Sequence, residues 1–240
     1  MEIKKSKGFQ EDRAKFYAAC TASILIELRK KEVVFRDLKP ENILISGDGY
    51  LKLIDFGFGK VLGKNKKTFS LCGTPDYVAP EILLNQGYNH SVDTWALGVL
   101  VYEMVANETP FKSSGGAKGI LKNILNKKLV FPKDKFSHVS KDCISFISEC
   151  LKKEPMHRLG YKDARELKAH PWFQEFGKHG WNALERKLIR PPYVPTDVNP
   201  EKIPTKEPKE GELEPPADVH DYEIDSIFAD FTATDLTGSP

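Results

Sequence analysis

Two short segments carry polar side chains whose types and spacing suit the transfer of a phosphoryl group. Residues 35–42 read FRDLKPEN, and residues 55–57 read DFG. Asp37 and Asn42 are five positions apart, and Asp55 follows Asp37 by eighteen positions. Phosphoryl transfer needs a carboxylate beside the attacking hydroxyl, a cation near the phosphate and oxygen ligands for Mg²⁺. The two segments together contain all of these groups.

Four side chains can be assigned to these tasks. Asp37 would orient a substrate hydroxyl and accept its proton, and Lys39 would balance the charge that develops on the γ-phosphate. Asn42 and Asp55 would hold Mg²⁺ against the phosphate oxygens. Asp and Asn also cap turns beside hairpins, and this simpler interpretation suits any one of them alone. Because a turn does not also require Lys39 or the Phe-Gly that follows Asp55, the complete set favours the catalytic interpretation.

The surrounding residues predict several helices. Apolar side chains within 11–30 fall on one helical stripe, and acidic residues at its start favour a helix there. Residues 91–106 are apolar on nearly every face, as expected of a helix buried in the middle of a helical domain, with Ser91 placed to cap it. Further helices are predicted at residues 117–127, 138–153 and 163–169.

Short strands should position the two polar segments. Residues 33–35 read as a strand, and residues 43–45 and 51–54 read as a hairpin around a Gly-Asp-Gly turn. Asp37 would therefore lie on the loop before the hairpin, and Asp55 would lie just after it.

The composition indicates a globular intracellular protein. A chain of 240 residues with 40% hydrophobic residues can form one or two domains with an ordinary core. The four cysteines form no C-x-x-C pair, so neither a disulfide framework nor a zinc site is expected, and a reducing compartment fits best. The longest apolar stretch is too short to cross a bilayer, and the charged N-terminus is not typical of a signal peptide.

The C-terminal segment differs from the rest of the chain. Residues 191–240 hold twelve acidic and three basic side chains, so they carry −9, whereas residues 1–190 carry +11. Nine of the sixteen prolines also lie in this segment. The composition predicts an extended or disordered acidic tail on a basic body.

A third segment narrows the interpretation to a family. Residues 67–81, KTFSLCGTPDYVAPE, resemble the activation and substrate-binding loop of AGC-group Ser/Thr protein kinases, above all the cyclic-nucleotide-dependent ones. The cGMP-dependent branch is slightly closer than the cAMP-dependent branch, because of residues 66–68 and 84–87. Together with the two polar segments, the resemblance is to the helical C-terminal lobe of the protein kinase fold.

This resemblance implies a fold and a domain division. The fold class would be α+β, with a mainly α-helical C-terminal lobe, a small catalytic-loop β-hairpin and an extended C-terminal tail. A partial protein kinase domain would cover residues 1–173, and an AGC-kinase tail would cover residues 174–240. ATP and Mg²⁺ would be the cofactors. Residues 228–232, FADFT, match the F-x-x-F-[ST] motif of such tails.

The resemblance also implies roles for single residues. Ser70 would be the activation-loop phosphosite, with its phosphate clamped by Arg36 and Lys60, although an ordinary surface serine is the alternative. Leu44 would lie beneath the adenine ring of ATP, an assignment that is compatible with a core leucine. Asp93 would fix the backbone of the catalytic loop.

Other residues would bind the substrate or brace the lobe. Glu41, Glu103 and Thr74 occupy substrate-binding positions, and the two acids imply a Lys/Arg-rich peptide. Glu103 could instead be a buried acid that is paired within its helix environment. Glu81 and Arg158 would form a buried ion pair.

The first part of the chain lacks several kinase features. The 34 residues before Phe35 contain no Gly-rich phosphate loop, no strand Lys and no helix Glu, and the glycines at 57, 59 and 63 have the wrong spacing for such a loop. We therefore expect a fragment without the N-terminal lobe, with weak or no activity of its own. The complete protein would phosphorylate Ser or Thr in basic proteins. The alternative is a non-catalytic module that binds substrates or a kinase partner.

The expected partners follow from the same resemblance. They are basic protein or peptide substrates, an upstream activating kinase, the missing N-terminal lobe, and a cyclic-nucleotide-binding regulatory domain or subunit. Neither nucleic acid nor a membrane span is expected. The predicted location is the cytoplasm, with access to the nucleus.

Overall fold

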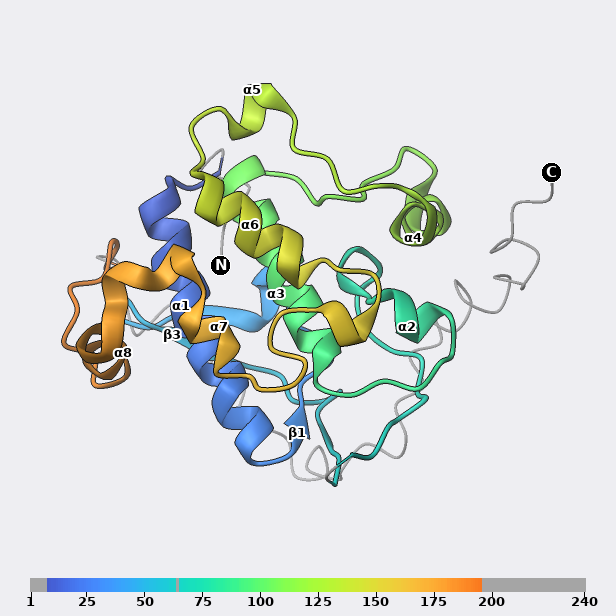
Figure 1. The fold of residues 1–240 in the computed structure, drawn as a ribbon, viewed down its shortest axis with the longest axis horizontal. Coiled ribbons are helices and arrows are strands. Elements are labelled where there is room, and N and C mark those ends of the chain that lie inside the picture. Colours follow the sequence, from blue (N-terminus) through green and yellow to red (C-terminus); the bar gives the residue numbers. More distant parts are fainter. Residues whose placement is uncertain (1–7, 64, 196–240) are drawn as a thin grey trace, which may run out of the picture.

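The computed structural model describes residues 8–63 and 65–195, and Figure 1 shows their arrangement. The α-helices within these residues are α1 (Glu11–Lys30), α2 (Pro80–Leu83), α3 (Ser91–Ala106), α4 (Gly116–Asn126), α5 (Lys133–Phe136), α6 (Lys141–Cys150), α7 (Glu166–Ala169) and α8 (Gly177–Glu185). The strands are β1 (Val33–Val34), β2 (Ile43–Ile45), β3 (Leu51–Leu53) and β4 (Lys60–Val61). The described part is therefore rich in helices with small sheets, as the predicted α+β class requires.

Three helices form the centre of the molecule. Figure 1 shows α3 crossing between α1 and α6, and it packs against both of them. Every residue of α3 is buried, which explains why its sequence is apolar on nearly every face. Acidic residues lie in the first turn of α1 and basic residues in its last turn, which suits the helix dipole. The helices predicted at 11–30 and 91–106 are confirmed with these bounds.

The start of α3 differs from the prediction that Ser91 caps it. The N-cap position is His90, and Ser91 is the first helical residue. The backbone N–H of Ser91 instead donates to Asn89 Oδ1 at 3.0 Å. The side chain of Ser91 is buried and donates to Glu81 Oε1 at 3.3 Å, which links α3 to α2.

A buried ion pair joins α2 to the loop after α6. Arg158 donates to both carboxylate oxygens of Glu81, at 2.6 and 2.9 Å, and both side chains are almost fully buried. Arg158 also donates to the carbonyl oxygen of Ser91. The predicted pair of Glu81 and Arg158 is therefore present, and it connects the loop after α6 to α2 and to the start of α3.

The two small sheets place the polar segments. Strands β2 and β3 are antiparallel, with Ile43 opposite Leu53 and Ile45 opposite Leu51, as the predicted hairpin requires. Strand β1 pairs with β4, a partner that sequence reasoning did not identify because β4 has only two residues. Residues 35–42 therefore connect β1 to β2, and residues 54–59 connect β3 to β4.

Several helices differ from their predicted bounds. The helix predicted at 138–153 is shorter, because Ser140 Oγ accepts a hydrogen bond from the backbone N–H of Cys143 and so caps α6. The short helices α2 and α5 have only four residues each, too few to give a periodic apolar pattern.

The first part of the predicted tail contains a packed helix, so residues 177–185 differ from the expectation of a largely extended or disordered tail, whereas residues 196–240 lie outside the described residues. Helix α8 follows a 3₁₀ turn at Pro171–Phe176. Phe176, Trp181 and Leu184 are buried, and the rings of Phe173 and Trp181 are 5.3 Å apart. This apolar contact holds the segment against the helical body, despite the acidic and proline-rich sequence that follows. The boundary at residue 174 stays a prediction, and residues 228–232 lie outside the described residues.

In the described ranges, no helix combines the length and the apolar character that a membrane span needs.

Candidate active site

The loop between β1 and β2 is hydrogen-bonded to one carboxylate of α3. The backbone N–H groups of Phe35 and Arg36 donate to the two oxygens of Asp93, each at 2.8 Å. Arg36 has a positive φ of 71°, a conformation that a non-glycine residue adopts only at a cost. Burial raises the pKa of Asp93 to about 6, while the two N–H groups and the charge of Arg36 act to lower it. As predicted, Asp93 therefore fixes the backbone of residues 35–42, the predicted catalytic loop.

Asp37 is the centre of a hydrogen-bonded network. Its Oδ1 accepts a bond from Thr74 Oγ1 at 2.8 Å, and its Oδ2 accepts bonds from Asn42 Nδ2 at 2.7 Å and Lys39 Nζ at 2.8 Å. Lys39 also donates to Thr74 at 2.9 Å, and Asn42 donates to the Asp37 carbonyl oxygen at 2.9 Å. The carboxylate is almost completely buried. Four predicted site residues are thus brought together, three from residues 35–42 and Thr74 from residues 67–81, the predicted activation loop, which we call the activation segment.

Asp55 lies beside this network but is exposed. Its Oδ1 accepts a bond from the backbone N–H of Gly57 at 3.0 Å, and its φ is 61°. The N–H of the preceding Ile54 donates to the carbonyl oxygen of Asn42 at 3.0 Å, which brings the two segments next to each other. The amide nitrogen of Asn42 is used on Asp37, so its side-chain oxygen is left as the acceptor. Asn42 and Asp55 therefore supply two neighbouring groups with oxygen acceptors.

An apolar surface lies next to Asp55. Leu44, Ile54 and Phe56 are exposed by 49%, 37% and 49%, and the last two flank Asp55 in the sequence. The ring of Phe56 packs edge-on against the buried ring of Phe35 at 5.1 Å. Leu44 is thus accessible to a ligand, and a purely core role does not fit its exposure.

Ser70 is exposed on the activation segment, and two cations lie near it. Lys60 Nζ donates to Thr68 Oγ1 at 3.0 Å, and that hydroxyl lies 3.4 Å from Ser70 Oγ. Arg36 donates to the hydroxyl of Tyr88 at 3.2 Å, and this hydroxyl donates to the Ser70 carbonyl oxygen at 2.6 Å. Each cation therefore reaches Ser70 through one intervening side chain.

A groove of about 530 Å³ opens beside Lys39 and Thr74. Its walls carry Glu41, Asp76 and Glu103, together with the hydroxyl of Tyr77, which donates to Glu103. Glu41 is exposed and Glu103 is buried. Burial, followed by the charge of Glu103, raises the pKa of Tyr77 well above its ordinary value, so the phenol stays protonated. The groove is acidic close to Asp37.

Asp76 is a groove residue that sequence reasoning did not select. It is half-buried and accepts a bond from Thr109 Oγ1 at 2.6 Å. At the rim, Glu108 is paired with Lys112 at 2.6 Å and Lys135 at 2.5 Å. The position of Asp76, two residues after Thr74 in the activation segment, was the available signal. The participation of residues around 108 depends on the packing of a later loop and had no sequence signal.

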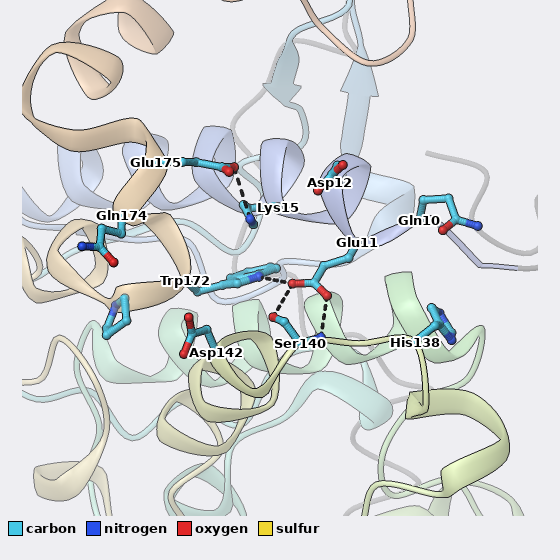
Figure 2. Close-up of a pocket in the computed structure, with 11 residues that line it drawn as sticks. Gln10, Glu11, Asp12, Lys15, His138, Ser140, Asp142, Trp172, Gln174 and Glu175 are labelled. Carbon is cyan, nitrogen blue, oxygen red and sulfur yellow. Dashed lines mark hydrogen bonds and ion pairs between the residues drawn. The ribbon is translucent and has the colours of Figure 1, made fainter.

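Figure 2 shows a different pocket, of about 540 Å³, beside the first turn of α1. Glu11 accepts bonds there from Ser140 N and Oγ and from Trp172 Nε1. Burial acts to raise the pKa of Glu11, but these hydrogen bonds hold it below its ordinary value. The carboxylate thereby braces α1 against the start of α6. None of the predicted site residues lines this pocket.

Comparisons with known proteins agree with this geometry. The family model of the protein kinase domain matches residues 1–173. The chain is 41% identical over 195 residues to the cAMP-dependent protein kinase catalytic subunit of Arthrobotrys oligospora, covering 80% of this chain and 36% of that protein. It is 44% identical over 200 residues to the Serine/threonine-protein kinase SCH9 of Candida albicans, covering 82% and 24%. It is 38% identical over 201 residues to the cGMP-dependent protein kinase, isozyme 1, of Drosophila melanogaster, covering 80% and 25%. The chain thus spans between about a quarter and about a third of the length of these relatives.

Proposed function

Because this chain belongs to the protein kinase domain family and resembles AGC-type Ser/Thr kinases, we propose that the protein transfers the γ-phosphate of ATP to Ser or Thr in basic proteins. The observation that carries this proposal is the network around Asp37. Lys39, Asn42 and Thr74 fix its carboxylate at one end of an acidic groove. A carboxylate held in this way is oriented before the substrate arrives.

The residues of the network would divide the reaction between them. A substrate hydroxyl entering beside Thr74 would donate to the Asp37 carboxylate, which would accept its proton as the oxygen attacks the γ-phosphorus and the bond from that phosphorus to the bridging oxygen breaks to release ADP. Lys39 would place its charge near the transferred phosphoryl group. Thr74 would hold the side chains of Asp37 and Lys39 in position relative to each other, because it is hydrogen-bonded to both.

The acceptors of Asn42 and Asp55 fit a magnesium ion that carries the nucleotide phosphates. Mg²⁺ prefers hard oxygen ligands and commonly binds through one or two protein side chains plus phosphate oxygens. Asp55 is exposed and Asn42 keeps its side-chain oxygen as an acceptor, so both would be able to contribute. When bound, the ion would neutralise charge on the phosphates. Leu44 would contact the adenine, since it is half-exposed next to this site.

The groove supports a basic substrate. Glu41, Asp76 and Glu103 line one continuous cavity that begins at Lys39. Within the described residues, the exposed carboxylate of Glu41 forms no hydrogen bond or ion pair, so a Lys or Arg of the substrate could bind it directly. We expect the change Glu41→Gln to raise KM for an Arg/Lys-rich peptide severalfold with little change in kcat.

Activation would depend on phosphorylation of Ser70 by another kinase or by a second copy of this one. A phosphate adds a charge of about −2 and three strong acceptors. Arg36 and Lys60 each lie one side chain away from Ser70, so both could turn towards such a phosphate. The four cysteines are free and buried, which supports a reducing compartment such as the cytoplasm.

We further propose that these 240 residues alone transfer phosphate slowly. They contain neither a Gly-rich phosphate loop nor a strand Lys before Phe35. Losing one preorganised charge contact commonly reduces a rate by about 10²–10³. The exposed apolar side chains of Leu44, Ile54 and Phe56 would suit a covering domain that completes the nucleotide site.

The test is phosphate transfer from labelled ATP·Mg²⁺ to an Arg/Lys-rich peptide. It should compare these 240 residues, a version extended upstream through the transcript, and Asp55→Ala in both. Asp55 has a φ of 61° and its side chain accepts a bond from Gly57 N, so urea unfolding of Asp55→Ala is compared with that of its parent to separate a loss of activity from a loss of stability. Activity that appears in the extended form and disappears with Asp55→Ala supports the proposal. Silence in both forms, with retained peptide binding, would instead indicate a non-catalytic binding module.

A further inference from the structure

We infer that Tyr88 is a positioning residue, whose hydroxyl couples the state of Ser70 to the catalytic loop through Arg36. The inference rests on the proposed function and names a group that neither the catalytic network nor the phosphate clamp includes. The contacts of the buried Tyr88 hydroxyl support it.

Tyr88 joins two segments that are far apart in the sequence. It lies between α2 and α3 and is only 2% exposed. Its hydroxyl donates to the carbonyl oxygen of Ser70 at 2.6 Å and accepts a bond from Arg36 Nη1 at 3.2 Å. The sulfur of Cys72 lies 3.6 Å from the same oxygen. A phenol has one donor, so the donor is used on the activation segment and an acceptor site is used on the catalytic loop.

The backbone around Tyr88 fixes the position of its hydroxyl. The N–H of Tyr88 donates to the carbonyl of Thr68 at 2.9 Å, and the N–H of Thr68 donates to the carbonyl of Tyr88 at 3.0 Å. The preceding Gly87 has a φ of +70°, and a Cβ there would lie 2.7 Å from the ring of Phe69. The activation segment is therefore held beside Tyr88 by two backbone bonds, and a glycine at position 87 leaves room for the ring of Phe69.

The Tyr88 hydroxyl links two segments, because it donates to Ser70 and accepts from Arg36. It holds the backbone of Ser70 next to Arg36, the residue that precedes Asp37. A phosphate on Ser70 would thus lie close to the guanidinium of Arg36, and less conformational freedom would be lost when the two groups bind each other. Burial, followed by the influence of Cys72, raises the pKa of Tyr88 far above its ordinary value, so the donor is retained at physiological pH.

The chain offers a matched control for removing this hydroxyl. Tyr50 is also buried, and its hydroxyl donates to the carbonyl oxygen of Ile189 at 2.6 Å, a contact outside the site. Tyr88→Phe and Tyr50→Phe therefore each remove one buried phenol–carbonyl bond. Only the first change breaks a link between Ser70 and Arg36.

The experiment uses the upstream-extended protein with phosphoserine installed at position 70 by genetic encoding, compared with unmodified Ser70. We expect phosphorylation to raise kcat by a similar factor in the parent and in Tyr50→Phe. In Tyr88→Phe this factor should be about tenfold smaller, with KM for the peptide unchanged. The ³¹P NMR titration should show the phosphate pKa below about 6 in the parent, and nearer to that of a free phosphoserine in Tyr88→Phe.

Two results would overturn the inference. One is an equal kcat gain and an equal ³¹P titration in Tyr88→Phe and its parent. The other is a loss of the same size in Tyr50→Phe, which would indicate a general effect of removing a buried hydroxyl. If the parent shows no Asp55-dependent transfer, the proposed function fails, whereas the ³¹P titration still decides whether Tyr88 positions the phosphate.

Discussion

Replacing Asp93 tests whether one buried carboxylate holds the catalytic loop in place. Asp93 is 4% exposed, and its two oxygens accept the N–H groups of Phe35 and Arg36, each at 2.8 Å. Asp93→Ala leaves both donors without a partner. An unsatisfied buried donor costs about 1–3 kcal/mol, so we expect a loss of about 2–6 kcal/mol in the free energy of unfolding. Asp93→Asn keeps one acceptor oxygen and should lose about half as much.

Urea unfolding at pH 7 measures the loss in the free energy of unfolding, and amide hydrogen exchange shows which part of the chain is affected. The amides of Phe35 and Arg36 should exchange faster in Asp93→Ala than the change in global stability alone would give. Asp163→Ala is the control, because Asp163 lies on the surface and pairs only with the neighbouring Arg165 among the described residues. A loss below about 1 kcal/mol in Asp93→Ala, with unchanged exchange at both amides, would refute the reasoning.

The same carboxyl gives a pH dependence with a defined sign. Burial raises the pKa of Asp93 from 3.8 to about 6 in the folded protein. The folded state therefore binds more protons than the unfolded state between these values, and stability is lost as pH rises from about 4 to about 6. Over this interval the free energy of unfolding should fall by about 3 kcal/mol. Asp93→Asn cannot titrate, so the stability difference between the parent and this variant should shrink over that interval. A difference that grows with pH would contradict the assignment.

Two further predictions concern stability. Arg158→Met should cost about 3–5 kcal/mol in urea unfolding because it leaves the Glu81 carboxylate buried without its cation, whereas the double change with Glu81→Met should recover most of the loss; additive losses would contradict this. Gly49→Ala should destabilise the protein by at least about 1 kcal/mol more than Gly47→Ala, because Gly49 has a φ of +80° and an added Cβ would lie 2.5 Å from Pro191, whereas nothing lies within 4 Å of a Cβ at Gly47. Equal effects at the two glycines would show that the close approach of Pro191 to Gly49 does not contribute to stability.

Local sequence patterns were sufficient for the elements that carry the site. The stripe in α1 and the apolar run in α3 predicted both helices with their observed bounds, because each helix is long enough for its pattern to be read. The hairpin of β2 and β3 followed from two short apolar runs around a Gly-Asp-Gly turn. The order of Asp37, Asn42 and Asp55 then located the polar segments relative to these elements.

Contacts between distant segments could not be read from local patterns. The bond from Thr74 to Asp37 joins residues 37 positions apart, and the bond from Arg36 to Tyr88 joins residues 52 positions apart. The helix α8 was missed because its apolar residues precede an acidic, proline-rich stretch that dominated the composition. Each of these features depends on which surfaces meet after folding.

The strained residues of the site show how the fold positions its polar groups before any ligand is present. Arg36 and Asp55 both have positive φ, which costs a non-glycine residue about 1–2 kcal/mol. At Arg36 the cost is offset by the bonds of Asp93 to two successive amides, and at Asp55 by the bond from Gly57 N. These turns direct the chain so that Asp37 meets Thr74 and Asp55 lies beside Asn42. The geometry around Asp37 therefore depends on helix α3 as much as on the loop itself, and for this reason a change at Asp93 should weaken the fold and disturb the site together.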